Sequence, residues 1–149
     1  MTTRANYAEL NRPAIEALGA VGRNFGSIEP KLRALVELRV SQINGCGYCV
    51  DVHATQARSH GETQQRLDLV ATWWECDFFT PAEVAALGWA EALTDISEGH
   101  APDELYQALA PHYSEQQIVD LTLIVSVMNA WNRIAIAFKQ HPKRRGQPS

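Results

Sequence analysis

The chain of 149 residues is long enough to bury one hydrophobic core but short for two, so we expect a single domain. Its 46% hydrophobic and 20% charged residues are typical of a globular protein and exclude a disordered one. The 17 acidic residues outnumber the 13 lysines and arginines, and the net charge of −4 argues against nucleic acid as a partner.

The first half of the chain is predicted to be helical. Apolar residues at spacings of three and four predict an amphipathic helix over residues 7–22. A proline in the first turn and an Asn-Gly turn at the end bound a second helix over residues 30–43. A third helix is expected over residues 46–60, with a glycine after it as terminator, and a fourth over residues 62–73.

The second half carries the clearest helix starts. The segment 80–83, Thr-Pro-Ala-Glu, combines an N-cap hydroxyl, a proline and a carboxylate, and predicts a helix through Leu93. Pro102 opens a short helix that ends before Pro111. A second capping box at residues 114–117 leads into a long helix over residues 118–138, for which a strand is the alternative over part of its length.

Together these signals predict an all-α domain of about six to eight helices over residues 1–142. The remaining residues, 143–149, are rich in basic and turn-forming residues, and we expect them to form a frayed basic tail.

Residues 118–138 are the longest apolar stretch, but charged and amide side chains interrupt it. We therefore interpret it as a buried helix and expect no membrane partner. Its all-round apolar character is compatible with the centre of one core or with a second face against another subunit. The N-terminus has no apolar segment of the signal-peptide kind, and three cysteines are too few for a disulfide-rich secreted domain. The expected location is the cytoplasm.

Cys46, Cys49 and His53 form the pattern that carries chemistry. At about 100° per residue they would share a stripe about 60° wide on one helix. The spacing of the cysteines brings their Cα atoms to about 5–6 Å, within the range of a disulfide. A helix start stabilises thiolate over thiol, and a histidine one turn further on can act as a general base. We interpret the pair as a dithiol built to become a disulfide.

Two other interpretations use the same residues. The cysteines could be small core residues beside a core histidine. Alternatively, Cys76 or His60 could join them in a zinc site, although structural zinc takes four ligands and three on two helical turns are crowded. We favour neither, expect no metal or cofactor, and regard Cys76 as a plain buried or half-buried thiol.

The segment from Glu37 to His53 resembles the core of the carboxymuconolactone decarboxylase superfamily, in particular its AhpD-like alkylhydroperoxidase branch. The core motif spans residues 32–60, and the likeness continues to residues 129–133. This resemblance implies an AhpD-like helical bundle that assembles as trimers or hexamers. It also implies a peroxidase cycle in which Cys49 attacks the peroxide, Cys46 resolves the sulfenic acid as a disulfide, and His53 belongs to the proton relay. An organic hydroperoxide or hydrogen peroxide would be the substrate and an external dithiol protein the reductant.

The chain departs from the AhpD pattern at two positions. AhpD has a relay glutamate twelve residues before its first cysteine, where this chain has Ala34. Glu37, one turn later, is the nearest carboxylate, and it is either a shifted relay acid or a solvated glutamate on the helix flank. Between the cysteines AhpD has a histidine, whereas Tyr48 here is neutral near pH 7 and offers no charge to a thiolate.

Arg39 falls on the apolar side of its predicted helix and therefore needs a partner. The candidate partners are Asp51, Glu91, Asp95 and Asp120. A group of aromatic residues could wall a pocket for an organic peroxide, although core packing is the favoured interpretation. These residues are Trp73, Trp74, Phe78 and Phe79.

The leading functional hypothesis is a thiol-dependent peroxidase of antioxidant defence. A lactone decarboxylase, the other named activity of the superfamily, is an alternative that would not require two cysteines. A non-catalytic redox sensor, whose disulfide controls oligomerisation, is the other alternative.

Overall fold

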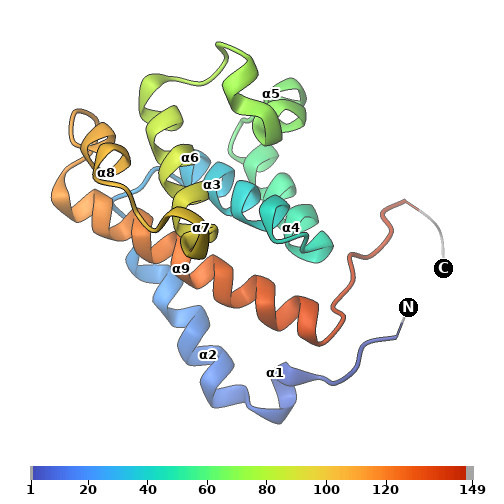
Figure 1. Cartoon of the computed structure of the whole chain (residues 1–149). Helices are drawn as coiled ribbons and strands as arrows, with labels where there is room; N and C mark the ends of the chain where they lie inside the picture. Colours follow the sequence, from blue (N-terminus) through green and yellow to red (C-terminus); the bar gives the residue numbers. More distant parts are fainter. Residues whose placement is uncertain (1, 147–149) are drawn as a thin grey trace.

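The computed structural model describes residues 2–146, which fold into nine α-helices and two 3-10 helices without a strand (Figure 1). The all-α prediction is confirmed, and the strand alternative for the last long segment is wrong. The helices are α1 Tyr7–Leu10, α2 Arg12–Val21, η1 Gly22–Asn24, α3 Pro30–Ile43, α4 Gly47–Ser59, α5 Gln64–Leu69, η2 Val70–Glu75, α6 Pro81–Thr94, α7 Ile96–Gly99, α8 Asp103–Leu109 and α9 Glu115–Ala137.

Two single-turn helices, α1 and α7, take the number of α-helices above the predicted six to eight. The helix predicted over residues 7–22 is divided at Asn11, which has a non-helical φ of −138°. Its side chain accepts a hydrogen bond from the Ala14 backbone N–H at 3.4 Å and so caps α2. Pro13 follows in the first turn of α2, where its missing N–H costs nothing.

Both predicted capping boxes are present. Thr80 and Ser114 each accept a hydrogen bond from the N3 backbone, and the N3 side chains of Glu83 and Gln117 bond back to the cap residues. The predicted starts of α6 and α9 follow from these local contacts, with α9 beginning at Glu115 rather than at residue 118.

The 23-residue helix α9 is the spine of the domain, with α3, α4 and α6 packed against it (Figure 1). By length and composition α9 is the one helix of the described residues that could cross a membrane, yet it buries Leu121, Ile124 and Val125 in the main core. The core helix of a globular domain passes the same test of composition. Val119, Leu123 and Ile136 leave part of its apolar surface exposed.

Arg39 lies on α3 and pairs with Glu91 of α6, one of its four predicted candidates. Its Nε donates to Glu91 Oε1 at 2.7 Å, and the Trp73 indole N–H donates to the same oxygen at 2.8 Å. The carboxylate is thereby supplied with two donors, as a partly buried charge requires.

The four aromatic residues considered as a pocket wall serve different purposes. Phe79 is buried in a second hydrophobic cluster, to which α3 contributes Leu35 and Leu38, and Trp73 packs against this cluster. Trp74 and Phe78 are exposed, 53% and 42% respectively. The favoured interpretation of core packing therefore holds for two of them only.

The basic tail has no regular secondary structure over residues 143–146. Within it, Arg145 Nη2 lies 2.6 Å from Asp51 Oδ1 of α4. The last part of the predicted tail, residues 147–149, falls outside the described residues.

Candidate functional site

A tight turn between α3 and α4 presents the cysteine pair. Gly45 adopts a φ of +68°, which a glycine tolerates without a steric penalty. The Cys46 backbone N–H then donates to the Ser41 carbonyl at 3.0 Å, which fixes the chain as it enters α4. The cysteines are thus placed where two core helices meet.

Cys46 is the N-cap of α4 and is not part of the helix, contrary to the prediction that all three motif residues share one helical stripe. Its φ and ψ of −83° and 92° are extended, and the helix begins at Gly47. The Cys46 sulfur accepts a hydrogen bond from the Cys49 backbone N–H at 3.3 Å. A sulfur in this position meets the positive end of the helix, which stabilises it as a thiolate when the pair is reduced.

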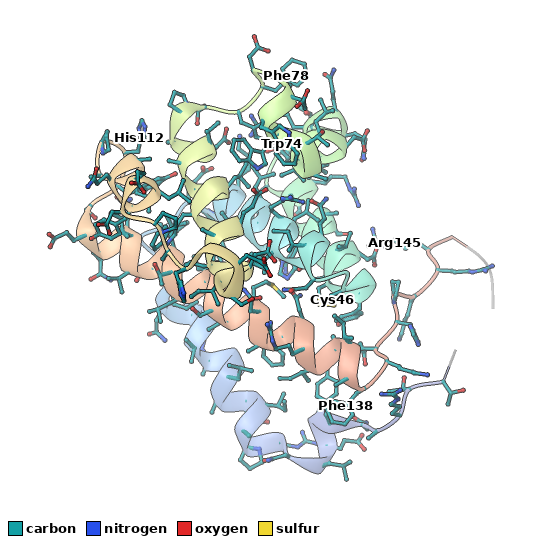
Figure 2. The ribbon with its side chains drawn as sticks, viewed as in Figure 1. Cys46, Trp74, Phe78, His112, Phe138 and Arg145 are labelled. Carbon is teal, nitrogen blue, oxygen red and sulfur yellow. A yellow bond between two sulfur atoms is a disulfide. The ribbon has the colours of Figure 1, made fainter. Side chains whose placement is uncertain are left out.

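Cys46 and Cys49 are joined by a disulfide, with their Cα atoms 5.3 Å apart (Figure 2). This separation lies in the range that the spacing predicted. Both side chains are nearly inaccessible, with 2% and 4% of the residue surface exposed. The pair is therefore buried in the protein, and a reactant must reach it through a pocket.

Such a pocket, of about 680 Å³, lies between α2, α3, α4 and α9. Cys49, His53 and Glu37 line it, whereas Cys46 is not among its lining residues. The remaining wall is mostly apolar and includes Phe25, Ile28, Ile124, Val127, Met128 and Trp131. The pocket thus reaches Cys49 and not Cys46, and much of its wall is apolar.

A chain of charged contacts runs along the pocket wall and starts at His53, one helical turn after Cys49 on α4. His53 Nδ1 lies 3.1 Å from Glu37 Oε2, outside the angle of an aligned hydrogen bond. The other Glu37 oxygen accepts from Arg33 Nε at 2.9 Å, and Arg33 Nη1 donates to the Gly22 carbonyl at 2.7 Å. Glu37 of α3 therefore contacts His53 of the neighbouring helix α4. Only 10% of the Glu37 side chain is exposed, so the alternative of a solvated glutamate on the helix flank is wrong.

The ionisation of Glu37 follows from these neighbours. Burial alone would raise the pKa of Glu37, but the contacts with His53 and Arg33 outweigh it and hold the pKa below its ordinary value. Glu37 is consequently a carboxylate throughout the neutral range, available to accept a proton or to orient the imidazole.

Two tyrosines also belong to the pocket wall. Tyr48, which directly precedes Cys49, lies beside Tyr7 of α1, and both line the pocket. Burial, with the nearby Tyr48, raises the pKa of Tyr7. Ala34, at the position where AhpD has its glutamate, lines the pocket as well but carries no group that could move a proton.

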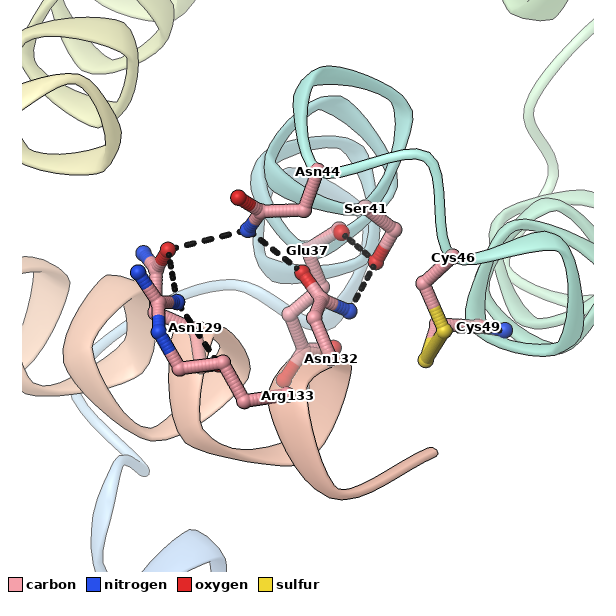
Figure 3. Close-up of a disulfide and its surroundings, with 8 residues drawn as sticks. All are labelled: Glu37, Ser41, Asn44, Cys46, Cys49, Asn129, Asn132 and Arg133. Carbon is pink, nitrogen blue, oxygen red and sulfur yellow. Dashed lines mark hydrogen bonds between the residues drawn. A yellow bond between two sulfur atoms is a disulfide. The ribbon is translucent and has the colours of Figure 1, made fainter. Parts of the chain in front are cut away.

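A buried amide network holds the turn before Cys46 against α9 (Figure 3). Asn44 Nδ2 donates to the side-chain oxygens of Asn129 and Asn132, each at 2.9 Å. Asn132 Nδ2 donates in turn to Ser41 Oγ at 3.1 Å, and this hydroxyl donates to the Glu37 carbonyl at 2.7 Å. The network therefore joins the end of α3, directly before the cysteines, to α9.

Replacing Asn132 by alanine is expected to lower the free energy of unfolding by about 2–3 kcal/mol, because Asn132 is fully buried and its removal leaves the groups of Ser41 and Asn44 without one partner each. Urea denaturation measures the change. The matched control is Asn24→Ala, an exposed asparagine that bonds only to backbone carbonyls, with an expected change within about 0.5 kcal/mol. Equal losses in the two variants would show that the network does not stabilise the turn.

Sequence reasoning missed Arg33 and the pocket. Arg33 and Glu37 are four residues apart on α3, a spacing that does indicate an ion pair. Arg33 also contacts the Gly22 carbonyl of η1. This contact depends on how the chain turns between η1 and α3, and the sequence has no local signal for that turn.

The zinc interpretation has no support in the described residues. Over residues 2–146, no three His, Cys, Asp or Glu side chains gather as a set of metal ligands. Cys46 and Cys49 are bonded to each other, and Cys76 packs against the second hydrophobic cluster as a free, half-buried thiol.

Comparison with known proteins agrees with this architecture. The model of the carboxymuconolactone decarboxylase family matches residues 9–92. An uncharacterized protein of Bacillus subtilis, YdfG, is 42% identical over 139 residues, which is 92% of this chain and 95% of the relative.

Solved structures extend the likeness to the whole fold. A protein of unknown function from Agrobacterium tumefaciens, described as a candidate AhpD antioxidant defence protein, has 39% identity and a TM-score of 0.91, covering 96% of this chain and all of that one. The debrominase Bmp8 shares the fold at 23% identity and a TM-score of 0.79, covering 91% of this chain and 74% of that one. The chain therefore belongs to the carboxymuconolactone decarboxylase family, in its AhpD-like branch.

Proposed function

We propose that the protein is a thiol peroxidase that reduces hydroperoxides through the Cys46–Cys49 pair, as an antioxidant enzyme. The observation that carries this proposal is one pocket that Cys49, His53 and Glu37 line together. Cys46 does not line this pocket but is bonded to Cys49. Such a site offers a nucleophilic sulfur, a histidine that can move a proton and a carboxylate that can orient the histidine.

In the first step the Cys49 thiolate attacks the terminal oxygen of a hydroperoxide. A sulfur–oxygen bond forms, the O–O bond breaks, and the alkoxide leaves as the alcohol after it takes a proton from His53. Glu37, which contacts His53 on the far side, holds the imidazole in place and balances its positive charge.

In the second step the Cys46 sulfur attacks the Cys49 sulfenic acid, the disulfide forms and water leaves. One hydroperoxide and one protein dithiol therefore give one alcohol, one water and one protein disulfide. No cofactor takes part in this scheme.

An external dithiol must then reduce the disulfide, with its two thiol protons and two electrons passing to the cysteine pair. Attack on the Cys49 sulfur is favoured, because Cys49 lines the pocket and because Cys46 can leave as a thiolate that the start of α4 stabilises. A dithiol protein of the cytoplasm suits this step. We expect a homo-oligomer, a trimer or a hexamer, for which the exposed apolar residues of α9 offer a contact surface.

The test is the consumption of cumene hydroperoxide by the reduced protein in the absence of other thiols. We expect one equivalent of cumyl alcohol and one Cys46–Cys49 disulfide per protomer, followed by multiple turnovers when dithiothreitol or a dithiol protein is added. Cys76→Ser is the control and is expected to behave like the wild type, because Cys76 lies outside the pocket. A reduced protein that leaves alkyl hydroperoxides and hydrogen peroxide intact, with every dithiol tried, would refute the proposal.

A further inference from the structure

The pocket that Cys49 lines is long, and its two ends are chemically different. Along α4 and its C-cap the lining residues run from Tyr48 to His60, twelve positions that correspond to about 18 Å of helix. On α9 they run from Ile124 to Ala135, eleven positions or about 16 Å. A small peroxide would fill only a fraction of this space.

The orientation of the helices fixes which groups stand at each end. Ser27 donates to Asp120 at 2.6 Å, so the loop after η1 lies near the start of α9. Asn44 contacts Asn132, so the cysteine turn lies near the end of α9. The pocket thus runs along α9 from the disulfide to the loop of residues 22–28, with α2 on the other side of α9 from α6 (Figure 1).

The middle of the pocket is apolar. Side chains of α9 at spacings of three and four face it, and the loop after η1 closes it from the other side. These side chains are Ile124, Val127, Met128, Trp131, Phe25 and Ile28. Such a lining favours an elongated apolar body over a hydrated polar one.

The far end carries basic groups. Arg23 of η1 and His60, the C-cap of α4, both line the pocket there and are exposed at its mouth. Among the residues that the structure describes, Glu37 is the one acidic side chain of the lining. It lies between the two ends, because it contacts His53 on one side and pairs on the other with Arg33, which in turn donates to the Gly22 carbonyl next to Arg23. Its charge is therefore already paired with Arg33. Glu29, at the start of α3, is exposed but is not part of the lining.

Helix dipoles do not decide the charge preference of this mouth. The start of α3, with Pro30 in the lining, and the end of α4, with His60, meet here and have opposite partial charges. Their effects offset each other, so the preference comes from the side chains. Arg23 is a permanent cation, and His60 offers an N–H donor.

We propose that the pocket takes a long-chain organic hydroperoxide that carries a carboxylate, such as a fatty-acid hydroperoxide. The apolar chain lies along α9, the carboxylate lies between Arg23 and His60, and the peroxide group reaches Cys49. This inference rests on the proposed function for its chemistry, but the recognition of an amphipathic carboxylate can be measured separately from any turnover.

Binding is measured by calorimetry on the oxidised protein, which cannot reduce a peroxide. The probes are dodecanoate and dodecan-1-ol, below their aggregation concentrations. We expect dodecanoate to bind more tightly than the alcohol, and Arg23→Gln to weaken dodecanoate binding about three- to fivefold, the upper part of the range of an exposed ion pair. His60→Gln is expected to reduce the preference for dodecanoate by a smaller factor.

Arg12→Gln is the matched control. It removes the same charge from an exposed position of α2, the helix directly before η1, and this position does not line the pocket. It should leave the affinity for dodecanoate unchanged. Equal affinities for dodecanoate and dodecan-1-ol would overturn the inference, as would an equal loss in the Arg12 and Arg23 variants or the absence of binding by both probes.

The kinetic measurement compares linoleic acid hydroperoxide with its methyl ester. We expect the ratio of their kcat/KM values to favour the acid and to fall in Arg23→Gln. Turnover of cumene hydroperoxide without a preference for the acid would overturn the inference and leave the proposed function intact. Tight, Arg23-dependent binding of dodecanoate by a protein that reduces no hydroperoxide would overturn the proposed function and leave the binding site intact.

Discussion

Replacing Cys49 by serine is expected to reduce peroxide consumption to the uncatalysed background. A serine hydroxyl is almost entirely protonated near neutral pH, whereas a thiolate attacks the O–O bond directly. Because Cys49 lines the pocket and Cys46 does not, the remaining thiol of this variant has no comparable access to a bound peroxide. Stopped-flow measurement of cumene hydroperoxide consumption by the reduced variant tests the expectation.

Cys46→Ser is expected to stop one step later. The first equivalent of peroxide is consumed and Cys49 remains as a sulfenic acid, since no second sulfur lies at the start of α4 to form the disulfide. Dimedone labelling and intact mass detect this intermediate, and a thiol reductant should then form a mixed disulfide at Cys49. Multiple turnovers with a dithiol protein are lost.

The two variants separate the competing hypotheses. A sulfenic acid trapped at Cys46 in Cys49→Ser, with no reaction in Cys46→Ser, would reverse the assigned roles. Full activity of the double serine variant on a lactone substrate would favour the decarboxylase alternative. A change of size-exclusion profile on oxidation, without any turnover in the wild type, would favour the redox sensor.

Local signals explain why the helices and the cysteine pair could be predicted. The capping boxes at Thr80 and Ser114 act within four residues, and the disulfide distance depends only on a spacing of three. The same spacing placed Cys46 inside a helix, and this was wrong because the boundary depends on backbone angles at Gly45 and Cys46. Element types were therefore easier to predict than the residue at which each element begins.

The pocket could not be predicted in this way, because it is made by contacts between distant segments. Glu37 and His53 are sixteen residues apart and meet because α3 and α4 pack as a hairpin. Met128 and Trp131 reach the pocket from α9, and Phe25 reaches it from the loop after η1. The sequence shows that these residues are apolar. Whether an apolar residue packs in a core or lines a cavity depends on the neighbouring helices.

Glu37→Gln is expected to lower kcat/KM for hydroperoxide by about 10²-fold, the lower end of the contribution of general acid–base catalysis. The amide is close in shape to the carboxylate but is neutral, so it can neither balance a charged His53 nor accept its proton. It also leaves Arg33 without its carboxylate. The variant should therefore form the Cys49 sulfenic acid slowly while keeping the disulfide chemistry of the pair.

The dependence on pH follows from the lowered pKa of Glu37. Since the carboxylate stays ionised below its ordinary titration range, protonation of Glu37 should not lower the wild-type rate in mildly acidic solution. The stabilising effect of the carboxylate on the fold is fully present above the pKa of an unfolded glutamate and is lost as the pH falls through the lower pKa of the folded state. The two proteins should thus differ most in unfolding free energy at neutral pH and least in strong acid.

Glu62→Gln provides the control for simply breaking a buried ion pair. Glu62 Oε1 accepts from Arg66 Nε at 2.8 Å with the same four-residue spacing as Arg33 and Glu37, and only 2% of its side chain is exposed. Because Glu62 lies outside the pocket, its replacement should affect stability without a comparable loss of kcat/KM. Equal losses of kcat/KM in both variants would mean that Glu37 acts only through the fold. A loss of kcat/KM that is selective for Glu37→Gln would place Glu37 in the relay that serves Cys49.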